Sequence, residues 1–317
     1  MDMIPRSTTF CPAPATITEQ NLEDQTGKVF IVTGATGGIG EGVANILYHR
    51  NGTVYLAARS ESKVNDTILR IRKEHQNSTG KLVFLKLVLD DLTTIKSSAE
   101  EFLSKESRLD VLFNNAGVMI PPTGSKTKQG YELQYGVNNL AHFLLTHFLR
   151  PVLATTAKIA EPYSVRVIWV SSSAADGAPR PAIDFKNMDY AKEEGMWAKC
   201  SRSKAASVIH SAEFARREQR AGSGILSLAL NPGNFVTNLQ QNMPKIQLAM
   251  FKMIAHPPIN GAYTELFAAF DKSITSANNG GWVSPFGKIE KPRADLVAEE
   301  IGRKLWTWSE EQTRPYL

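Results

Sequence analysis

The glycine-rich stretch at residues 33–40 limits most strongly what this 317-residue chain can fold into. It follows residues 28–32, a short β-branched and aromatic run that predicts a buried strand. It precedes residues 41–50, where apolar side chains recur at helical spacing. A strand, a glycine turn and a helix N-terminus together form a cradle for a phosphate group. The alternative, an ordinary tight turn, is less compatible with these flanking patterns.

Apolar runs and helical patterns also alternate along the rest of the chain. We predict further strands at residues 53–58, 81–88, 110–114, 166–171 and 225–230. We predict helices at residues 61–75, 94–105, 131–154 and 199–220. This alternation is typical of parallel sheets with right-handed crossovers. The expected fold class is therefore α/β: one doubly wound Rossmann domain with a parallel sheet of about seven strands, flanked by helices.

Two segments lie outside this alternation of strands and helices, and we predict their structure separately. Residues 1–25 are polar and contain several prolines, and we expect them to form a loose N-terminal arm before a domain at residues 26–317. Residues around 238–260 mix apolar side chains with prolines. They predict either a flap over a substrate pocket or a helical surface insertion.

Composition limits the class of partner. The formal net charge is +5, but the basic residues are scattered, so we expect no nucleic-acid partner. No stretch of 18 apolar residues predicts a membrane span. Cys11 and Cys200 provide neither a disulfide framework nor metal-ligand spacing, which favours a reducing, cytoplasmic setting without a metal. His142 and His147 are five residues apart, which is poor spacing for a shared metal, so we expect core or surface roles.

Several motifs in one order resemble the short-chain dehydrogenase/reductase family over about residues 26–317. The pattern Thr33-Gly34-x-x-x-Gly38-x-Gly40 resembles the family's cofactor loop, and Asn114-Asn115-Ala116-Gly117 resembles the motif after its fourth strand. Asn138, Ser172 and Lys204 match three members of its catalytic tetrad, and Asn231-Pro232-Gly233 with Thr237 matches its nicotinamide-side turn. The closing stretch, from residues 282–287 through residues 315–317, is similar to fungal retinol-dehydrogenase-type members, which implies secondary metabolism.

This resemblance implies a nicotinamide cofactor, and one residue bears on which one. Arg59 ends the second predicted strand, where an acidic residue would bind a ribose 2′-hydroxyl. An arginine there favours the 2′-phosphate of NADP(H), and Lys63 is close enough in sequence to assist. The expected cofactor-binding residues are Gly34, Gly38, Ile39, Gly40, Arg59, Lys63, Asn115, Lys204, Val236 and Thr237.

The third predicted strand departs from the family pattern. Family members of this type place an aspartate that contacts the adenine where this chain has Val88. Asp90 is a candidate replacement, and Asp91 aligns with a later acid that is usually structural.

The proton-carrying tyrosine of the family stands four residues before the lysine, and here that position is Cys200. A cysteine sulfur lies about 3 Å from its Cα, against about 6.5 Å for a tyrosine oxygen. The atom that carries the proton would lie roughly 3.5 Å farther from the substrate, which would disturb direct proton transfer. Lys204 lowers the pKa expected for the thiol, so a reactive thiolate is one interpretation, and an inert side chain that makes room for substrate is the other. Tyr190 is too distant in sequence to be an expected replacement.

We therefore expect an NADP(H)-dependent oxidoreductase that acts on a small, largely apolar carbonyl, alcohol, enone or iminium. The expected catalytic residues are Ser172, Cys200, Lys204 and Asn138, with the proton supplied by water, Cys200 or the substrate. The alternative is a non-redox isomerase, cyclase or dehydratase that uses Ser172 and Cys200. A non-catalytic nucleotide sensor fits less well. The family also makes a homodimer through residues 131–154 and 199–220 an open expectation.

Overall fold

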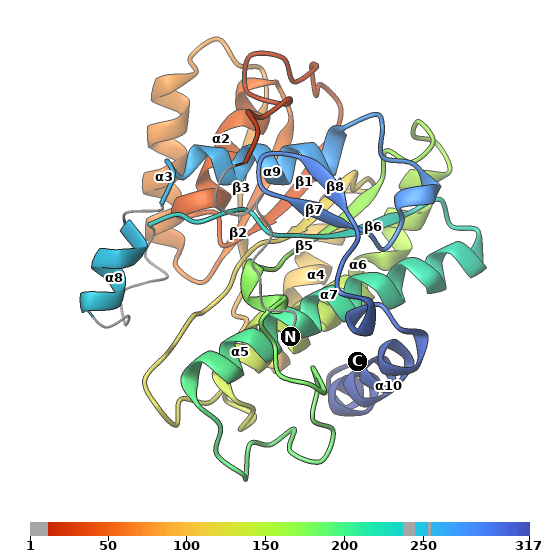
Figure 1. Ribbon diagram of the computed structural model, residues 1–317. Helices are drawn as coiled ribbons and strands as arrows, with labels where there is room; N and C mark the ends of the chain where they lie inside the picture. The colour runs from red at the N-terminus through yellow and green to blue at the C-terminus, as the bar shows by residue number, and fades with distance from the viewer. Residues whose placement is uncertain (1–11, 237–244, 253–254) are drawn as a thin grey trace.

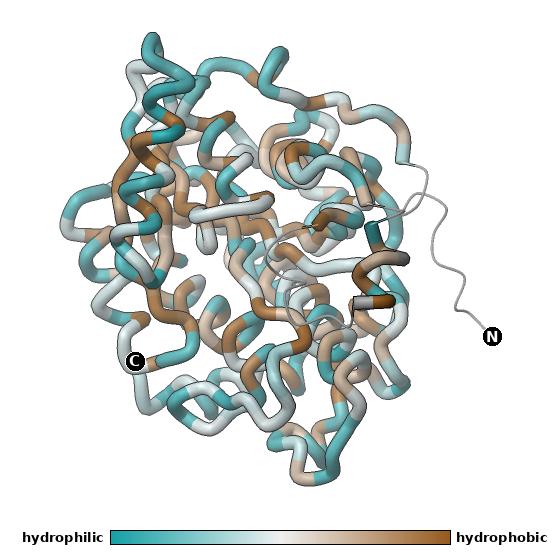
Figure 2. The backbone as a smooth tube through the Cα atoms, turned by 90° about the vertical axis from the view of Figure 1, so that its left-hand side faces the viewer, coloured by the Kyte–Doolittle hydropathy of each residue, from teal (hydrophilic) through white to brown (hydrophobic). Residues whose placement is uncertain are grey.

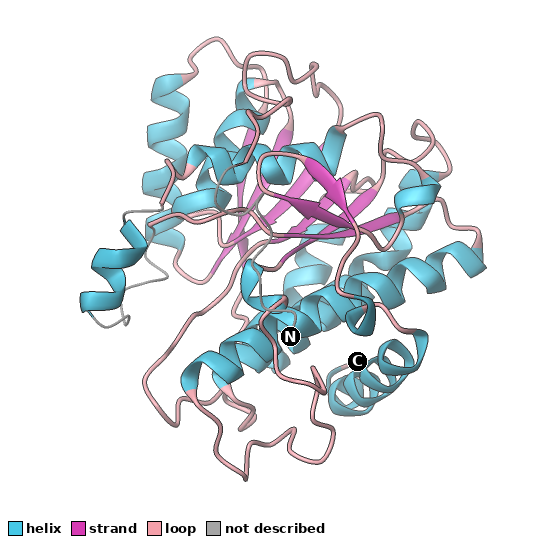
Figure 3. Cartoon of the chain, in the orientation of Figure 1, coloured by secondary structure: helices cyan, strands magenta, loops and turns pink. Residues whose placement is uncertain are grey.

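The computed structural model describes residues 12–236, 245–252 and 255–317, and within them one eight-stranded sheet lies between helices (Figures 1 and 3). The strand order is β3-β2-β1-β4-β5-β6-β7-β8. All neighbouring pairs from β3 to β7 are parallel, and β8 is antiparallel to β7. The strands are β1 (Val29–Thr33), β2 (Thr53–Ala58), β3 (Lys81–Lys86), β4 (Val111–Asn114), β5 (Arg166–Val170), β6 (Leu226–Leu230), β7 (Trp282–Ser284) and β8 (Lys288–Glu290). The predicted doubly wound α/β fold is confirmed, with one short antiparallel strand added at the edge.

Helices cover both faces of the sheet and bury a separate apolar cluster on each. The helices are α2 (Gly38–His49), α3 (Glu61–Glu74), α4 (Ile95–Leu103), α5 (Leu133–Tyr135), α6 (Ala141–Ala157), α7 (Met196–Ala221), α8 (Lys245–Lys252), α9 (Ile259–Phe270) and α10 (Glu299–Thr313). One cluster joins the sheet to α4, α6, α7 and α10, and the other joins it to α2, α3 and α9. Outer helices alternate between hydrophilic and hydrophobic residues along the tube in Figure 2, as helices with one buried face do. In the described part of the chain, no helix is both long and apolar enough to cross a membrane.

Parallel pairing brings the sequence motifs to one edge of the sheet. In register, Phe30 of β1 lies beside Val111 of β4, and Val111 lies beside Arg166 of β5. The carboxyl ends of β1, β4 and β5 therefore meet at the same edge. The loops that follow these strands contain the glycine-rich turn, the Asn-Asn-Ala-Gly motif and Ser172. In open α/β sheets, ligands bind at this edge.

The predicted helix at residues 131–154 is interrupted. The structure divides it into α5, a π-helical turn η2 (Gly136–Leu140) and α6, and Asn138 is at the centre of η2. A π turn adds one residue to the helical repeat, and such turns are frequent at functional sites. Periodicity over a long window averages this local change away, so the sequence predicted one continuous helix.

The second half of the expected N-terminal arm is held by the domain. Leu22 is only 4% exposed and belongs to the apolar cluster that contains α2 and α9. The Gln25 N–H donates to the Arg50 carbonyl oxygen at 2.7 Å, and Arg50 donates in return to the backbone oxygen of Glu19. Residues 18–25 thus differ from the predicted loose arm, because these contacts tie them to the end of α2. Residues 1–11 lie outside the described part.

The expected flap around residues 238–260 is described only in part. Residues 238–244 and 253–254 lie outside the described residues, and α8 forms the segment between them. In Figure 1, α8 lies at the left margin of the molecule, away from the sheet. Phe235 and His256, on either side of this region, form an isolated parallel bridge that brings its two ends together. Its role as a substrate flap stays a prediction.

Truncation of Leu22 tests the packed N-terminal segment. We expect Leu22→Ala to lower the free energy of unfolding by about 2–3 kcal/mol, because it removes a buried side chain and leaves a cavity. Leu69→Ala is the matched control, because Leu69 is 66% exposed, and it should change stability by less than about 0.5 kcal/mol. Urea unfolding measures both. Equal stabilities of the two variants would show that residues 18–25 are a loose arm after all.

Candidate active site

The glycine-rich turn forms a cradle that only glycine permits. Gly34 has φ +72°, a conformation that favours glycine. A Cβ on Gly40 would lie 2.4 Å from Asn115 Nδ2 and 2.8 Å from the Gly34 oxygen. Helix α2 begins at Gly38, and no side chain among the described residues caps its N-terminus. Its first N–H groups are therefore available to an anion, and the cradle fits a phosphate-bearing cofactor.

Asn115 closes this cradle from the neighbouring strand. Its side-chain amide donates to the Thr33 backbone oxygen at 2.7 Å. Its backbone N–H and that of Ala116 both donate to Thr33 Oγ1 at 2.9 Å. Asn115 thus holds the ends of β1 and β4 together, and its cofactor-binding role stays a prediction.

Asn138 joins the loop after β4 to helix α7. Its Oδ1 accepts from the Val118 N–H at 2.8 Å, and its Nδ2 donates to the Val118 oxygen at 3.1 Å. The same Nδ2 also donates to Ser203 Oγ at 3.2 Å. Asn138 is buried, so these bonds satisfy its amide without solvent.

Ser172 and Lys204 meet at the carboxyl end of β5. Ser172 Oγ accepts from the Ala174 N–H at 3.2 Å, and the structure records no hydrogen bond donated by this hydroxyl to any described residue. Lys204 Nζ donates to the Val170 oxygen at 3.1 Å. A Cβ on Gly117 would lie 3.6 Å from this amine, so the loop after β4 passes close to it. Burial lowers the pKa of Lys204, against the opposing effect of Cys200 and Glu265.

Comparisons with known proteins agree with this geometry. The family model described as short chain dehydrogenase matches residues 28–182. The protein named short-chain dehydrogenase/reductase pkfC of Emericella nidulans is 52% identical over 310 residues, covering 97% of this chain and 99% of that protein. The chain belongs to the short-chain dehydrogenase/reductase family. It is accordingly an enzyme of a family that binds a nicotinamide cofactor and acts on small molecules.

A second similar sequence and two solved structures agree with this family assignment or share the fold. A short-chain dehydrogenase/reductase of Phomopsis amygdali is 42% identical over 96% of this chain and 95% of its own length. Among solved structures, an uncharacterized protein from Mycobacterium paratuberculosis has a TM-score of 0.71 at 27% identity, over 94% of this chain and 97% of that one. NADPH-bound carbonyl reductase from chicken fatty liver shares the fold, with a TM-score of 0.63 at 22% identity over 86% and 100% of the two chains.

Cys200 lies one helical turn before Lys204 on the same face of α7 and is 3% exposed. Burial raises the pKa of its thiol, and nearby Glu132 raises it further, while Lys204 opposes both. Of the two interpretations of Cys200, this raised pKa supports the inert side chain over the reactive thiolate, because loss of solvent outweighs the nearby amine.

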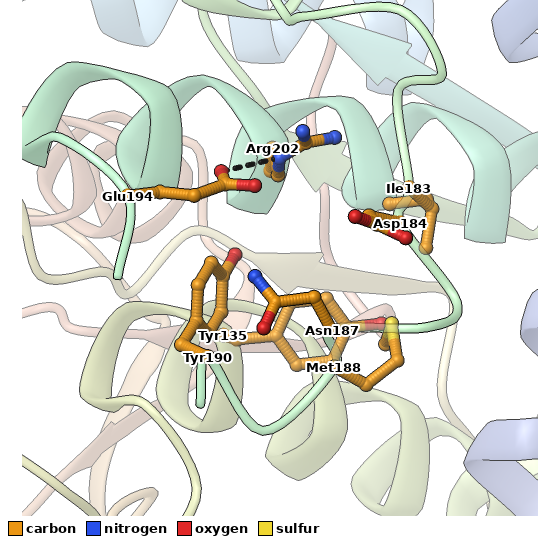
Figure 4. A pocket seen from close by; sticks show the side chains of 8 residues that line it. All are labelled: Tyr135, Ile183, Asp184, Asn187, Met188, Tyr190, Glu194 and Arg202. Carbon is orange, nitrogen blue, oxygen red and sulfur yellow. Dashed lines mark hydrogen bonds and ion pairs between the residues drawn. The ribbon is translucent and has the colours of Figure 1, made fainter. Parts of the chain in front are cut away.

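Tyr190 lies in the loop before α7, beside the face of that helix that presents Arg202. It lines a small cavity with Tyr135, Asn187 and Arg202 and points toward Glu194 (Figure 4). Arg202 is two positions from both Cys200 and Lys204, so it projects from the far side of the helix. Tyr190 thus does not occupy the place of the missing tyrosine, in agreement with the sequence-based expectation.

The residues expected at the adenine end are spread over the surface. The Arg59 side chain is 76% exposed and lies 3.8 Å from Asp90, a loose ion pair. Lys63 is exposed in the first turn of α3. Asp91 is instead buried and accepts hydrogen bonds from Lys128 at 2.7 Å and Gln129 at 2.9 Å, as expected for a structural acid.

The expected residues at the nicotinamide end are only partly described. Val236 is exposed just after Phe235, and Thr237 lies outside the described residues. Ile39 packs under the cradle against Gly261 of α9, where an added Cβ would meet it at 2.8 Å. Among the described residues, no three His, Cys, Asp or Glu side chains are grouped to hold a metal ion.

One buried acid beside this site is not among the residues predicted from the sequence. Glu265 is fully buried in α9, and neither carboxylate oxygen has a hydrogen-bond partner in the described structure. Burial raises its pKa to about 8, opposed by Lys204. The only signal in the sequence is a glutamate within the apolar run of residues 259–270.

The stability of the chain should depend on pH through Glu265. With a folded-state pKa of about 8 against an ordinary value of 4.5, the folded state holds a proton that the unfolded chain has lost. The free energy of unfolding therefore falls as pH rises between about 4.5 and 8. Glu265→Gln should remove this dependence and be more stable than wild type by about 2 kcal/mol or more near pH 8.

Unfolding in urea at about pH 5 and pH 8 measures this difference. Glu61→Gln, at an exposed position in α3, is the control and should follow wild type at both values. A constant difference between Glu265→Gln and wild type would contradict the burial of an uncompensated carboxyl group.

Proposed function

We propose that this chain is an NADP(H)-dependent oxidoreductase for a small, largely apolar metabolite, with an active site that lacks the family's tyrosine. The observation that carries the proposal is the meeting of the cradle, Ser172 and Lys204 at one edge of the sheet. When bound, the nicotinamide supplies or accepts a hydride. The candidate substrates are carbonyls, alcohols, enones and iminium ions.

The exposed guanidinium of Arg59 supports NADP(H) over NAD(H). It directly follows β2, and its one described ion pair, with Asp90, is long and solvent-exposed. Such a pair is weak, so Arg59 is available for a charge-assisted contact with a 2′-phosphate. Lys63 supplies a second exposed cation in the first turn of α3.

Each remaining site residue has a role that its contacts support. We infer that the Ser172 hydroxyl donates to a substrate oxygen and that Lys204 donates to ribose hydroxyls, which their contacts at the end of β5 support. Asn138 holds the π turn against α7. We infer that Cys200, in the place of the tyrosine, does not take a proton from an alcohol, because its buried thiol is already protonated. This favours reduction, with the proton delivered by water.

The setting of the enzyme is inferred from its relatives. The similar proteins of Emericella nidulans and Phomopsis amygdali are fungal, which supports a role in fungal secondary metabolism. A cytoplasmic location stays a prediction. A homodimer through α6 and α7 also stays a prediction, and it would have to accommodate α10, which bonds to α7 through His210 and Ser309 at 3.0 Å.

Cofactor choice tests the role of Arg59. Wild type should bind NADPH at least tenfold more tightly than NADH in a fluorescence titration, because a charge-assisted contact contributes more than about 1.4 kcal/mol. Arg59→Ala should weaken NADPH binding by roughly tenfold and leave NADH unchanged. Arg72→Ala, at an exposed position in the following helix α3, is the control. Equal affinities of wild type for the two nucleotides would overturn the choice of NADP(H).

Restoring the tyrosine separates redox from non-redox chemistry. We expect Cys200→Tyr to raise carbonyl reduction by about 10²-fold or more, because it returns a proton donor to the face that also presents Lys204. Cys200→Ser, which is close to cysteine in size, should stay near wild type. Activity is followed by the absorbance of the reduced nicotinamide and by product analysis. Loss of the native product in Cys200→Tyr, or product formation without a change in absorbance, would favour the non-redox alternative.

A further inference from the structure

His142 connects two motifs that the sequence places 105 residues apart, Thr33 and Asn138. It lies one turn after Asn138 and is buried. Its Nδ1 lies 3.3 Å from the Asn138 carbonyl oxygen, and its Nε2 lies 3.1 Å from Thr33 Oγ1. The imidazole therefore spans the gap between the π turn and the end of β1.

The partners of the ring determine which nitrogen carries the hydrogen. A carbonyl oxygen only accepts, so Nδ1 is the donor to Asn138. Burial, with Lys204 nearby, lowers the pKa of His142 to about 4, so the ring is neutral and Nε2 presents a lone pair. The Thr33 hydroxyl can donate to that lone pair while its oxygen accepts the N–H groups of Asn115 and Ala116. The Phe113 oxygen, at 3.1 Å, is the competing acceptor for the same hydroxyl.

From Asn138 the hydrogen bonds continue into α7. The Asn138 amide donates to Ser203 Oγ at 3.2 Å, and Ser203 Oγ donates to the Cys200 oxygen at 2.8 Å. The turn that contains Cys200 and Lys204 is thereby linked to Thr33, at the start of the cofactor cradle. His142 and Asn138 are the members of this hydrogen-bond chain that belong to neither the cradle nor α7, and His142 is the one that contacts the cradle.

We propose that His142 is a positioning residue that couples the cofactor cradle to the catalytic turn of α7. As a neutral Nδ1–H bridge, it holds the π turn at one distance from Thr33. Asn138, Ser203 and Lys204 then keep their places relative to the cradle. The coupling rests on the proposed function, because its main measure is the affinity for NADPH.

A double-mutant cycle tests this coupling. His142→Phe keeps a buried ring but removes both hydrogen bonds, and Thr33→Val removes the hydroxyl. Each single variant should weaken NADPH binding by at least about tenfold. The double variant should bind NADPH no more than about threefold less tightly than the weaker-binding single variant. His142→Gln, which can still accept from Thr33, should recover NADPH affinity to within about threefold of wild type.

His147→Phe is the control, because His147 is exposed on the same helix, and its NADPH affinity should stay within about twofold of wild type. Independent, multiplicative effects of His142→Phe and Thr33→Val would overturn the coupling. So would NADPH binding by a folded His142→Phe variant at wild-type strength. Absence of NADPH binding by wild type would instead contradict the proposed function itself.

A second measurement is made on wild type without the cofactor and uses a variant only to assign the signal. Nitrogen-15 NMR of wild type, with the His142 signal assigned by its loss in His142→Gln, should show the neutral Nδ1–H form between about pH 6 and 8. An Nε2–H tautomer or a protonated ring in that range would overturn the proposed bridge.

Discussion

The hydroxyl of Thr33 is the junction on which the site depends. β1 and β4 lie next to each other in the sheet, although 77 residues separate the end of β1 from the start of β4. Two backbone N–H groups of the loop after β4 converge on this one oxygen, and the Asn115 side chain returns a bond to the Thr33 carbonyl. Gly40 packs against that side chain so closely that a single added carbon would displace it. The shape of the phosphate cradle is therefore set jointly by two strands and not by the glycine turn alone.

The parts of the fold that the sequence predicted are those where one local signal dominates. Central parallel strands are buried on both faces and appear as continuous apolar runs, so β2 was located at both ends and β1 to within one residue. The edge strands β7 and β8, with three residues each, are too short for such a signal. The prediction of a loose N-terminal arm differs from the structure for another reason: Leu22 and Gln25 are held by partners distant in sequence.

The same distinction applies to the site. Asn138, Ser172 and Lys204 could be named because they belong to motifs at the ends of predicted elements, and the structure brings them to one edge. The hydrogen bonds of His142 and the isolation of Glu265 could not be predicted from the sequence, because each depends on side chains from other elements. His142 needs Thr33 of β1, and Glu265 is isolated by the packing of α9 on the sheet. A sequence pattern reports the periodicity of one element and not which polar partners its neighbours supply.

The ionisable groups around Lys204 share one physical tendency. Burial raises the pKa values of Cys200 and Glu265 and lowers those of Lys204 and His142, so in each case it favours the neutral form. Burial thus opposes charge on each of these groups in the interior of the site. Arg59, which would recognise a phosphate, lies instead on the exposed rim at the end of β2. Because desolvating a charged ligand is costly where no partner compensates it, this division agrees with the proposed anionic cofactor at the rim and the proposed apolar substrate inside.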